Sequence, residues 1–146
     1  MEKDGAQPIA FHPPVPIAEV RRLMREADVY VLPSTGREGW GVVLNEAMLE
    51  GCAVVAARQT GSGSALVRHG ESGLLFSAGS VRGLTEALRR LESDEGLRLR
   101  LAQTGQQRVS EEWVPSVAAE RLLLFAQALL RGEKVPAWPQ GPLGAG

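Results

Sequence analysis

The chain has 146 residues, of which 44% are hydrophobic and 23% are charged, and its formal net charge is −1. One domain with a sizeable core fits this length. The mixed charge gives no electrostatic argument for a nucleic-acid partner or an anionic membrane. The lone Cys52 rules out an internal disulfide, and we expect it to be a small buried residue in a reducing compartment.

The sequence contains no signal peptide and no apolar run of membrane-spanning length. We therefore expect a cytoplasmic protein without a transmembrane segment. His12 and His69 are isolated, and neither H-x-x-H nor C-x-x-C spacing occurs. The sequence thus predicts no metal site. A serine nucleophile elbow is not expected either, because the run GSGS at 61–64 does not place its serine centrally in G-x-S-x-G.

The first third of the chain predicts two strands and a helix behind a polar lead-in at residues 1–8. The segment IAF (9–11) is a short strand candidate, which Pro13 and Pro14 end. Residues 15–27 repeat apolar side chains at helical spacing, with arginines outward. The run DVYVLP (28–33) then predicts a strand buried on both faces of a parallel sheet.

The middle of the chain continues this alternation. A helix is predicted over 42–50, ended by a left-handed Gly51, and a buried strand CAVVAA follows at 52–57. The loop RQTGSGS (58–64) lies at a strand's carboxyl end, where ligands bind in open α/β sheets. Its hydroxyl groups either contact a phosphate or sugar, or cap a short helix at 65–69.

A last short strand, GLLF, is predicted at 73–76, and covering helices follow it. Ser80 and Asp94 are the expected caps of two of these helices, and residues 113–132 form a third. The folded domain is therefore expected over 9–131. Residues 132–146 form a Pro/Gly-rich tail with little reason to fold.

The segment from Ser34 to Glu50, STGREGWGVVLNEAMLE, joins turn residues to the start of a helix. Its glycines, at 36, 39 and 41, let the backbone approach a ligand closely. The first N–H groups of a helix lack an intrahelical partner and carry partial positive charge, so this end would attract a phosphate. Two acids, Glu38 and Glu46, either serve a ligand or are ordinary helix charges, and the residues alone leave both readings open.

The segment PSTGREGWGVVLNEAMLEGCAVVAA resembles the E-x7-E region of GT-B glycosyltransferases, in particular the large group that transfers sugars retentively from nucleotide donors. Glu38 and Glu46 match the two glutamates, while Trp40 replaces a usual Phe. Residues 61–88 resemble the family's next conserved segment, with Ser62 in place of a Gly and Ala65 in place of a Glu. The resemblance is continuous from Ile9 to about Arg131, far more specific than a lone glycine pattern.

The resemblance implies an α/β fold: a Rossmann-like parallel sheet of about four strands with flanking helices, the incomplete C-terminal half of a GT-B enzyme. The four predicted strands would be strands three to six of the order 3-2-1-4-5-6. Strands one and two and an N-terminal acceptor domain are expected to be absent from this chain. The strand at 28–33 would then have a bare edge, which either pairs with residues 9–11 or is covered by another chain in a homo-oligomer.

The resemblance also implies the roles of six site residues. Glu46 would accept hydrogen bonds from the ribose hydroxyls, and Glu38, the catalytic candidate, would contact the donor sugar. The amides of Gly39, Trp40, Gly41 and Val42 would bind the diphosphate. A nucleotide-diphosphate sugar would be the substrate, and no cofactor is expected.

Two classes of function remain open. The first is a glycosyltransferase donor-binding domain that serves carbohydrate biosynthesis, transferring a sugar to an unknown acceptor with retention. The alternative is a non-catalytic nucleotide-sugar-binding or assembly module, because the Arg/Lys pair by which family members neutralise the diphosphate has no match before Ile9. A response-receiver fold is a weaker rival, since it needs a late lysine and the only lysines are Lys3 and Lys134, in the end segments.

Overall fold

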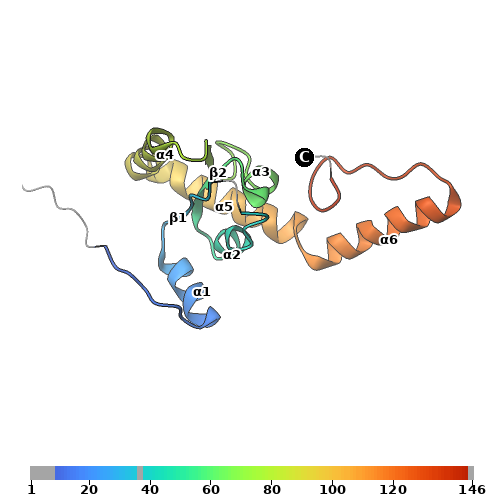
Figure 1. Cartoon of the computed structure of the whole chain (residues 1–146), viewed down its shortest axis with the longest axis horizontal. Coiled ribbons are helices and arrows are strands. Elements are labelled where there is room, and N and C mark those ends of the chain that lie inside the picture. Colours follow the sequence, from blue (N-terminus) through green and yellow to red (C-terminus); the bar gives the residue numbers. More distant parts are fainter. Residues whose placement is uncertain (1–8, 36–37, 145–146) are drawn as a thin grey trace, which may run out of the picture.

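The computed structural model describes residues 9–35 and 38–144, and within them three strands and six helices (Figure 1). The strands are β1 (Val29–Leu32), β2 (Ala53–Ala57) and β3 (Leu74–Phe76). The helices are α1 (Ile17–Glu26), α2 (Val43–Leu49), α3 (Gly61–Leu66), α4 (Val81–Ser93), α5 (Glu95–Glu112) and α6 (Pro115–Arg131). The predicted α/β class with a parallel sheet is confirmed, with three strands rather than about four.

The strands lie in the order β1-β2-β3, and both pairs are parallel. Val55 of the central strand is paired with Val31 of β1 on one side and with Leu74 of β3 on the other. All five residues of β2 are buried, because both faces of a parallel sheet are covered by helices. The buried strand predicted at 52–57 is therefore confirmed.

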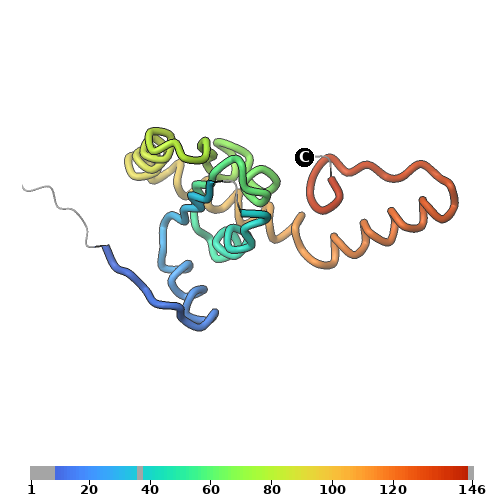
Figure 2. The backbone as a smooth tube through the Cα atoms, viewed as in Figure 1, coloured from blue at the N-terminus to red at the C-terminus, as the bar shows by residue number. Residues whose placement is uncertain are grey.

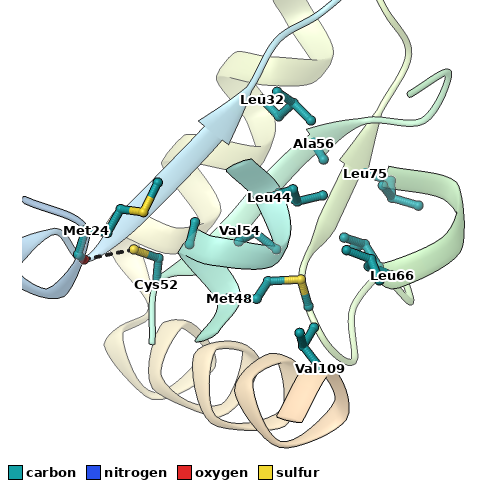
Figure 3. Packing of buried hydrophobic residues seen from close by; sticks show 12 residues of the cluster. Met24, Leu32, Leu44, Met48, Cys52, Val54, Ala56, Leu66, Leu75 and Val109 are labelled. Carbon is teal, nitrogen blue, oxygen red and sulfur yellow. Dashed lines mark hydrogen bonds between the residues drawn. The ribbon is translucent and has the colours of Figure 1, made fainter. Parts of the chain in front are cut away.

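The two faces of the sheet carry separate apolar clusters, to which β2 contributes alternate residues. On one face Val54 and Ala56 pack with residues of α1, α2, α3 and the end of α5, shown in Figure 3: Met24, Leu44, Met48, Leu66 and Val109. On the other face Val55 packs with Leu91 of α4 and Leu101 of α5. Helix α5 therefore reaches both clusters and ties the two layers together.

Cys52 is buried in the first cluster, and its Sγ donates to the carbonyl oxygen of Met24 at 3.0 Å (Figure 3). Burial raises the pKa of the Cys52 thiol, and the nearby charges of Glu50 and Asp28 add to this effect. The thiol thus stays protonated and unreactive. Its predicted role as a small buried residue is confirmed.

The segment at 9–11 is not a strand, so this part of the prediction is wrong. It runs extended and away from the sheet in Figure 2, and the side chains of Ile9 and Phe11 are 83% and 91% exposed. A strand gains its stability from backbone pairing and burial, and this segment has neither. Its direct pairing with β1, one of the two expected outcomes, therefore does not occur.

Helix α1 is held to the end of α2 by Glu50, which caps α2. The Glu50 side chain is only 8% exposed, and its two oxygens accept hydrogen bonds from Arg21 Nε at 2.5 Å and Arg25 Nη1 at 2.9 Å. The outward-facing arginines predicted for this helix thus include two that bind the neighbouring helix. Arg22, by contrast, pairs with Glu19 and Glu26 of its own helix.

Residues 132–144 are held by contacts with α5 and α6, although this tail was expected to have little reason to fold. Helix α6 projects from the body of the molecule and ends at Gly132 in the left-handed conformation, after which the chain runs back beside the helix (Figure 1). Arg121 of α6 donates to the carbonyl oxygens of Gln140 and Pro142, and its guanidinium lies 5.5 Å from the centre of the Trp138 ring. Arg108 Nη1 of α5 donates to Gln140 Oε1 at 2.7 Å.

Within the described ranges no single helix is long and apolar enough to cross a membrane. Helices α5 and α6 together reach the required length and composition, across a bend of 45°. Several leucines of α6 are nonetheless exposed, namely Leu122, Leu123, Leu129 and Leu130.

The contact between α1 and α2 should depend on pH through Glu50. Hydrogen bonds from Arg21 and Arg25 lower the pKa of Glu50 below its usual value. The pKa of Glu50 is therefore lower in the folded state than in the unfolded state, where it is about 4.3. The contact stabilises the fold fully at pH values above the unfolded-state pKa. This stabilisation is lost as the pH falls through the folded-state pKa. We therefore expect the urea midpoint of Glu50→Gln to fall less than that of the wild type between about pH 5 and pH 3.

Glu26→Gln is the matched control, because among the described residues Glu26 pairs with Arg22 of its own helix and does not join two elements. Its midpoint should follow the wild-type pH profile. Parallel profiles for wild type and Glu50→Gln would contradict the assignment.

The outer edge of β1 has no neighbouring strand among the described residues. An unpaired edge of a mostly apolar strand is a template for pairing with another chain. We therefore predict that the 146-residue chain self-associates at micromolar concentration, as sedimentation velocity would detect. A stable monomer whose amides from Val29 to Leu32 are protected from exchange would exclude this prediction.

Candidate functional site

The predicted site lies where the chain passes from β1 to α2, at the carboxyl ends of the strands. Residues 38–42 are the last part of the connecting loop at 33–42, and the first turn of α3 packs against them. Gly36, which was also expected to let the backbone approach a ligand, lies outside the described residues. The remaining predicted residues fall within this loop or on α2.

The carbonyl groups of the loop are fixed by the first turn of α3. Gly61 N donates to Gly39 O at 3.2 Å, and Ser62 N donates to Trp40 O at 2.8 Å. The Ser62 hydroxyl donates to Gly41 O at 3.1 Å, and the Ser62 side chain is fully buried. Three successive carbonyl oxygens therefore point towards α3.

The amide groups of the same loop have no acceptor among the described residues. Within the described part of the chain, no N–H group of residues 39–42 donates to a backbone or side-chain oxygen. Residues Gly39, Trp40 and Val42 are exposed, Val42 with 59% of its surface. Such unpaired amides before the first turn of a helix can bind an anion.

The two described glycines of the loop serve different purposes. Gly41 has a φ of +83°, and a Cβ there would lie 3.1 Å from both Leu32 Cδ2 and Ser62 Oγ. A side chain at this position would be strained and crowded, so the turn requires glycine. A Cβ at Gly39 would meet nothing within 4 Å, so the loop is open to solvent at that point.

Both glutamates lie close enough to Tyr30 for their charges to act on it. Glu38 is exposed, and Ser34 Oγ lies 3.5 Å from its Oε2, while Glu46 is half-buried on the first turn of α2. Burial raises the pKa of Tyr30, and the charges of Glu46, Cys52 and Glu38 add to this effect. The half-buried Tyr30 of β1 thus lies within reach of the charges of both predicted glutamates. Sequence reasoning missed it, although it is the one polar-tipped aromatic residue in an otherwise aliphatic strand.

Trp40 is held in place on two sides. Its Nε1 donates to Asn45 Oδ1 at 2.9 Å, and its ring centre lies 5.5 Å from that of Trp113, with 43° between the planes. The side chain still exposes 39% of its surface. Trp113 comes from the junction of α5 and α6, and no local signal in the sequence indicated that it reaches this loop.

The segment predicted as a loop at 58–64 instead contains the start of α3. Thr60 Oγ1 accepts a hydrogen bond from Gly63 N at 3.1 Å and so caps the helix. The hydroxyl groups were expected either to contact a ligand or to cap a helix, and the Thr60 hydroxyl caps α3. This helix begins at Gly61, four residues before the predicted start. Ser62, which replaces a usual glycine, faces Gly41.

His69 has a structural role at the edge of β3. Its Nδ1 accepts a hydrogen bond from Leu75 N at 2.9 Å. Within residues 9–35 and 38–144, no three His, Cys, Asp or Glu side chains are grouped so that they could hold a metal ion.

Comparison with known proteins relates this arrangement to a family. Residues 4–108 match the family described as "Glycosyl transferases group 1". The chain is 36% identical over 112 residues to the phosphatidyl-myo-inositol mannosyltransferase of Mycobacterium leprae, a match that covers 77% of this chain. It is 31% identical over 129 residues, 88% of this chain, to the D-inositol 3-phosphate glycosyltransferase of Corynebacterium urealyticum. The chain spans about 30% of the length of each of these relatives.

Solved structures give the same result. The C-terminal domain of the group 1 glycosyl transferase LpcC from Francisella tularensis aligns with a TM-score of 0.62 and 31% identity, over 70% of this chain and 50% of that one. HepE from Anabaena, solved in complex with UDP, aligns with a TM-score of 0.64 and 29% identity, over 78% of this chain and 30% of that one. The family match covers more than half of the sequence, and the chain therefore belongs to the group 1 glycosyl transferases.

Proposed function

We propose that this chain is the donor-binding part of a glycosyltransferase that transfers a sugar from a nucleotide-diphosphate sugar to an acceptor. The observation that carries the proposal is the loop at 39–42, whose carbonyl groups bind α3 while its amide groups have no acceptor among the described residues. Structures of HepE with UDP and with UDP-glucose support a donor of this class. A cytoplasmic location belongs to the same proposal.

In this proposal the amides of residues 39–42 bind the diphosphate. Negative charge grows on the diphosphate as the bond to the sugar breaks, and fixed N–H groups stabilise that charge without having to reorganise. The bonds from Gly61 and Ser62 to the loop provide the fixed geometry. This role needs no metal ion, because the amides and the positive end of α2 supply the electrostatic attraction.

The two carboxylates would bind the sugar portions of the donor. Glu46 would accept hydrogen bonds from the two ribose hydroxyls, since a carboxylate can accept from both members of a vicinal diol. Glu38, which is exposed, would contact the transferred sugar. Retention of configuration is part of the proposal, and finding the opposite anomer in the product would refute it.

Replacing Glu46 by alanine should weaken donor binding in this chain and in any longer protein that contains it. Hydrogen bonds to a charged group contribute about 1.5–3 kcal/mol, so the affinity for a nucleotide diphosphate should fall roughly tenfold to a hundredfold. Calorimetry with a panel of nucleotide diphosphates would measure this fall. Thermal unfolding of the same variant would show that the domain is intact.

Glu92→Ala is a suitable control, because Glu92 is exposed on α4, on the other face of the sheet. Its affinity should equal that of the wild type. If Glu46→Ala leaves donor affinity and turnover unchanged, the assignment is wrong. Binding by the longer protein without any sugar transfer would favour the non-catalytic binding module.

Ser62→Ala tests whether the fixed loop matters for binding. The variant loses the hydroxyl bond to Gly41 O but leaves that oxygen its bond from Leu44 N. We expect nucleotide diphosphate affinity to fall by about fivefold, because one neutral hydrogen bond contributes about 1 kcal/mol. Calorimetry on Ser64→Ala gives the matched control, since that exposed hydroxyl binds Gly61 O within α3. Equal effects of the two substitutions would contradict the role given to Ser62.

A further inference from the structure

A cavity separate from the donor loop lies between α3, α5 and the C-terminal segment. It has a volume of about 210 Å³. Its lining includes Arg68, Arg108 of α5, Trp113, and Gly141 and Gly144 of the returning chain. The cavity exists because the C-terminal segment folds back onto the body of the domain through Gln140.

The charged groups that line the cavity are all positive. Arg68 and Arg108 both line it, and no acidic side chain of residues 9–35 or 38–144 does. Arg108 Nη2 lies 3.4 Å from Glu112 Oε2, whereas Arg68 has only a distant partner, Glu71 Oε2 at 3.7 Å. The neighbouring acids therefore neutralise Arg108 more fully than Arg68, which keeps 43% of its side chain exposed.

In the part of the chain that the structure describes, unpaired hydrogen-bond donors lie beside the cavity, together with one unpaired acceptor, Glu112 Oε2, whose residue does not line it. The Arg108 side chain is only 9% exposed, and its Nε has no acceptor among the described residues. Trp113 Nε1 is likewise buried without an acceptor there. Burial lowers the pKa of Arg108, and although Glu112 opposes this effect, the positive charge of Arg68 adds to it. Such surroundings favour a ligand that brings negative charge and only acceptor atoms.

We propose that this cavity binds a phosphate group, either inorganic phosphate or the phosphate of a small phosphomonoester. The oxyanion lies between the guanidinium groups of Arg68 and Arg108, and any organic remainder packs beside Trp113. Arg108 offers its Nε, because its Nη1 donates to Gln140 and its Nη2 faces Glu112. Arginine suits this role because it keeps its charge when buried. The site does not depend on the proposed donor site.

Titration of the whole chain with inorganic phosphate tests the proposal, at constant ionic strength with chloride as the reference anion. Calorimetry should show saturable binding, and the NMR signal of the Trp113 indole N–H should shift with the same affinity. The titration is then repeated with glycerol phosphate, which distinguishes a phosphomonoester site from one for the free ion. Tighter binding of glycerol phosphate identifies the phosphomonoester as the ligand, and the reverse order identifies the free ion.

Arg68→Gln should weaken phosphate binding about tenfold or more, because it removes one charge-assisted contact. Because Arg68 is exposed, the substitution should leave the domain folded. Thermal unfolding of the variant would check that it does. Arg82→Gln is the matched control, since Arg82 is 90% exposed on α4 and does not line the cavity. Its phosphate affinity should equal that of the wild type.

Three results would overturn the proposal. The first is the absence of saturable binding at phosphate concentrations up to about 10 mM, because a dissociation constant above this value is too weak for a specific site. The second is equal phosphate affinity in Arg68→Gln and the wild type. The third is loss of phosphate binding when a nucleotide diphosphate saturates the protein, which would place the phosphate at residues 39–42. Unchanged nucleotide binding by Arg68→Gln separates this test from that of the donor site.

Discussion

The contact between the first turn of α3 and the loop at 39–41 is the constraint on which the proposed site depends. Two backbone amides and one buried hydroxyl of α3 bind three successive carbonyl oxygens of the loop. Because a peptide unit is planar, fixing its carbonyl group also fixes the direction of the amide in the same plane. The orientation of the loop amides is thus set by a helix that comes about twenty residues later in the sequence.

This contact requires two helical residues without side chains. A Cβ at Gly61 would lie 2.5 Å from Gly39 O, and a Cβ at Gly63 would lie 2.5 Å from both Ala57 O and Thr60 Oγ1. Any larger residue would push α3 away from the loop or from the end of β2. Glycine in a helix costs about 0.5–1 kcal/mol relative to alanine, and here the close approach offsets that cost. Ser62, which lies between these glycines in place of the family's usual glycine, donates a hydrogen bond to Gly41 O. This replacement therefore does not separate α3 from the loop.

Much of the fold was predictable because its elements carry local signals. The apolar runs at 28–33 and 52–57 became β1 and β2, and the caps at Ser80 and Asp94 begin α4 and α5 as expected. The errors arose where long-range contacts decide. Residues 9–11 have strand composition but no partner, and α3 begins at Gly61 because its packing against the loop outweighs the poor helix propensity of glycine.

Distant packing explains why sequence reasoning missed Trp113 and the fold of the C-terminal segment. Trp113 reaches Trp40 from the end of α5, and the C-terminal segment is held by Arg108 and Arg121. A Pro/Gly-rich composition indicates only that a segment cannot stabilise itself. The two arginines stabilise this segment from outside by binding its backbone carbonyl oxygens and the side chain of Gln140.

The two edges of the sheet differ in a way that bears on the site. At β3 the side chain of His69 binds the amide of Leu75, and α4 packs beside the strand, so all three of its residues are buried. Among the described residues, β1 pairs with β2 on one side and has no neighbouring strand on the other. Three of its four residues are only half-buried. Tyr30 is one of these three. The charges of Glu46 and Glu38 reach Tyr30, and the chain leaves β1 directly into the loop of the proposed site. The edge of the sheet that lacks a neighbouring strand among the described residues is therefore also the edge next to that site.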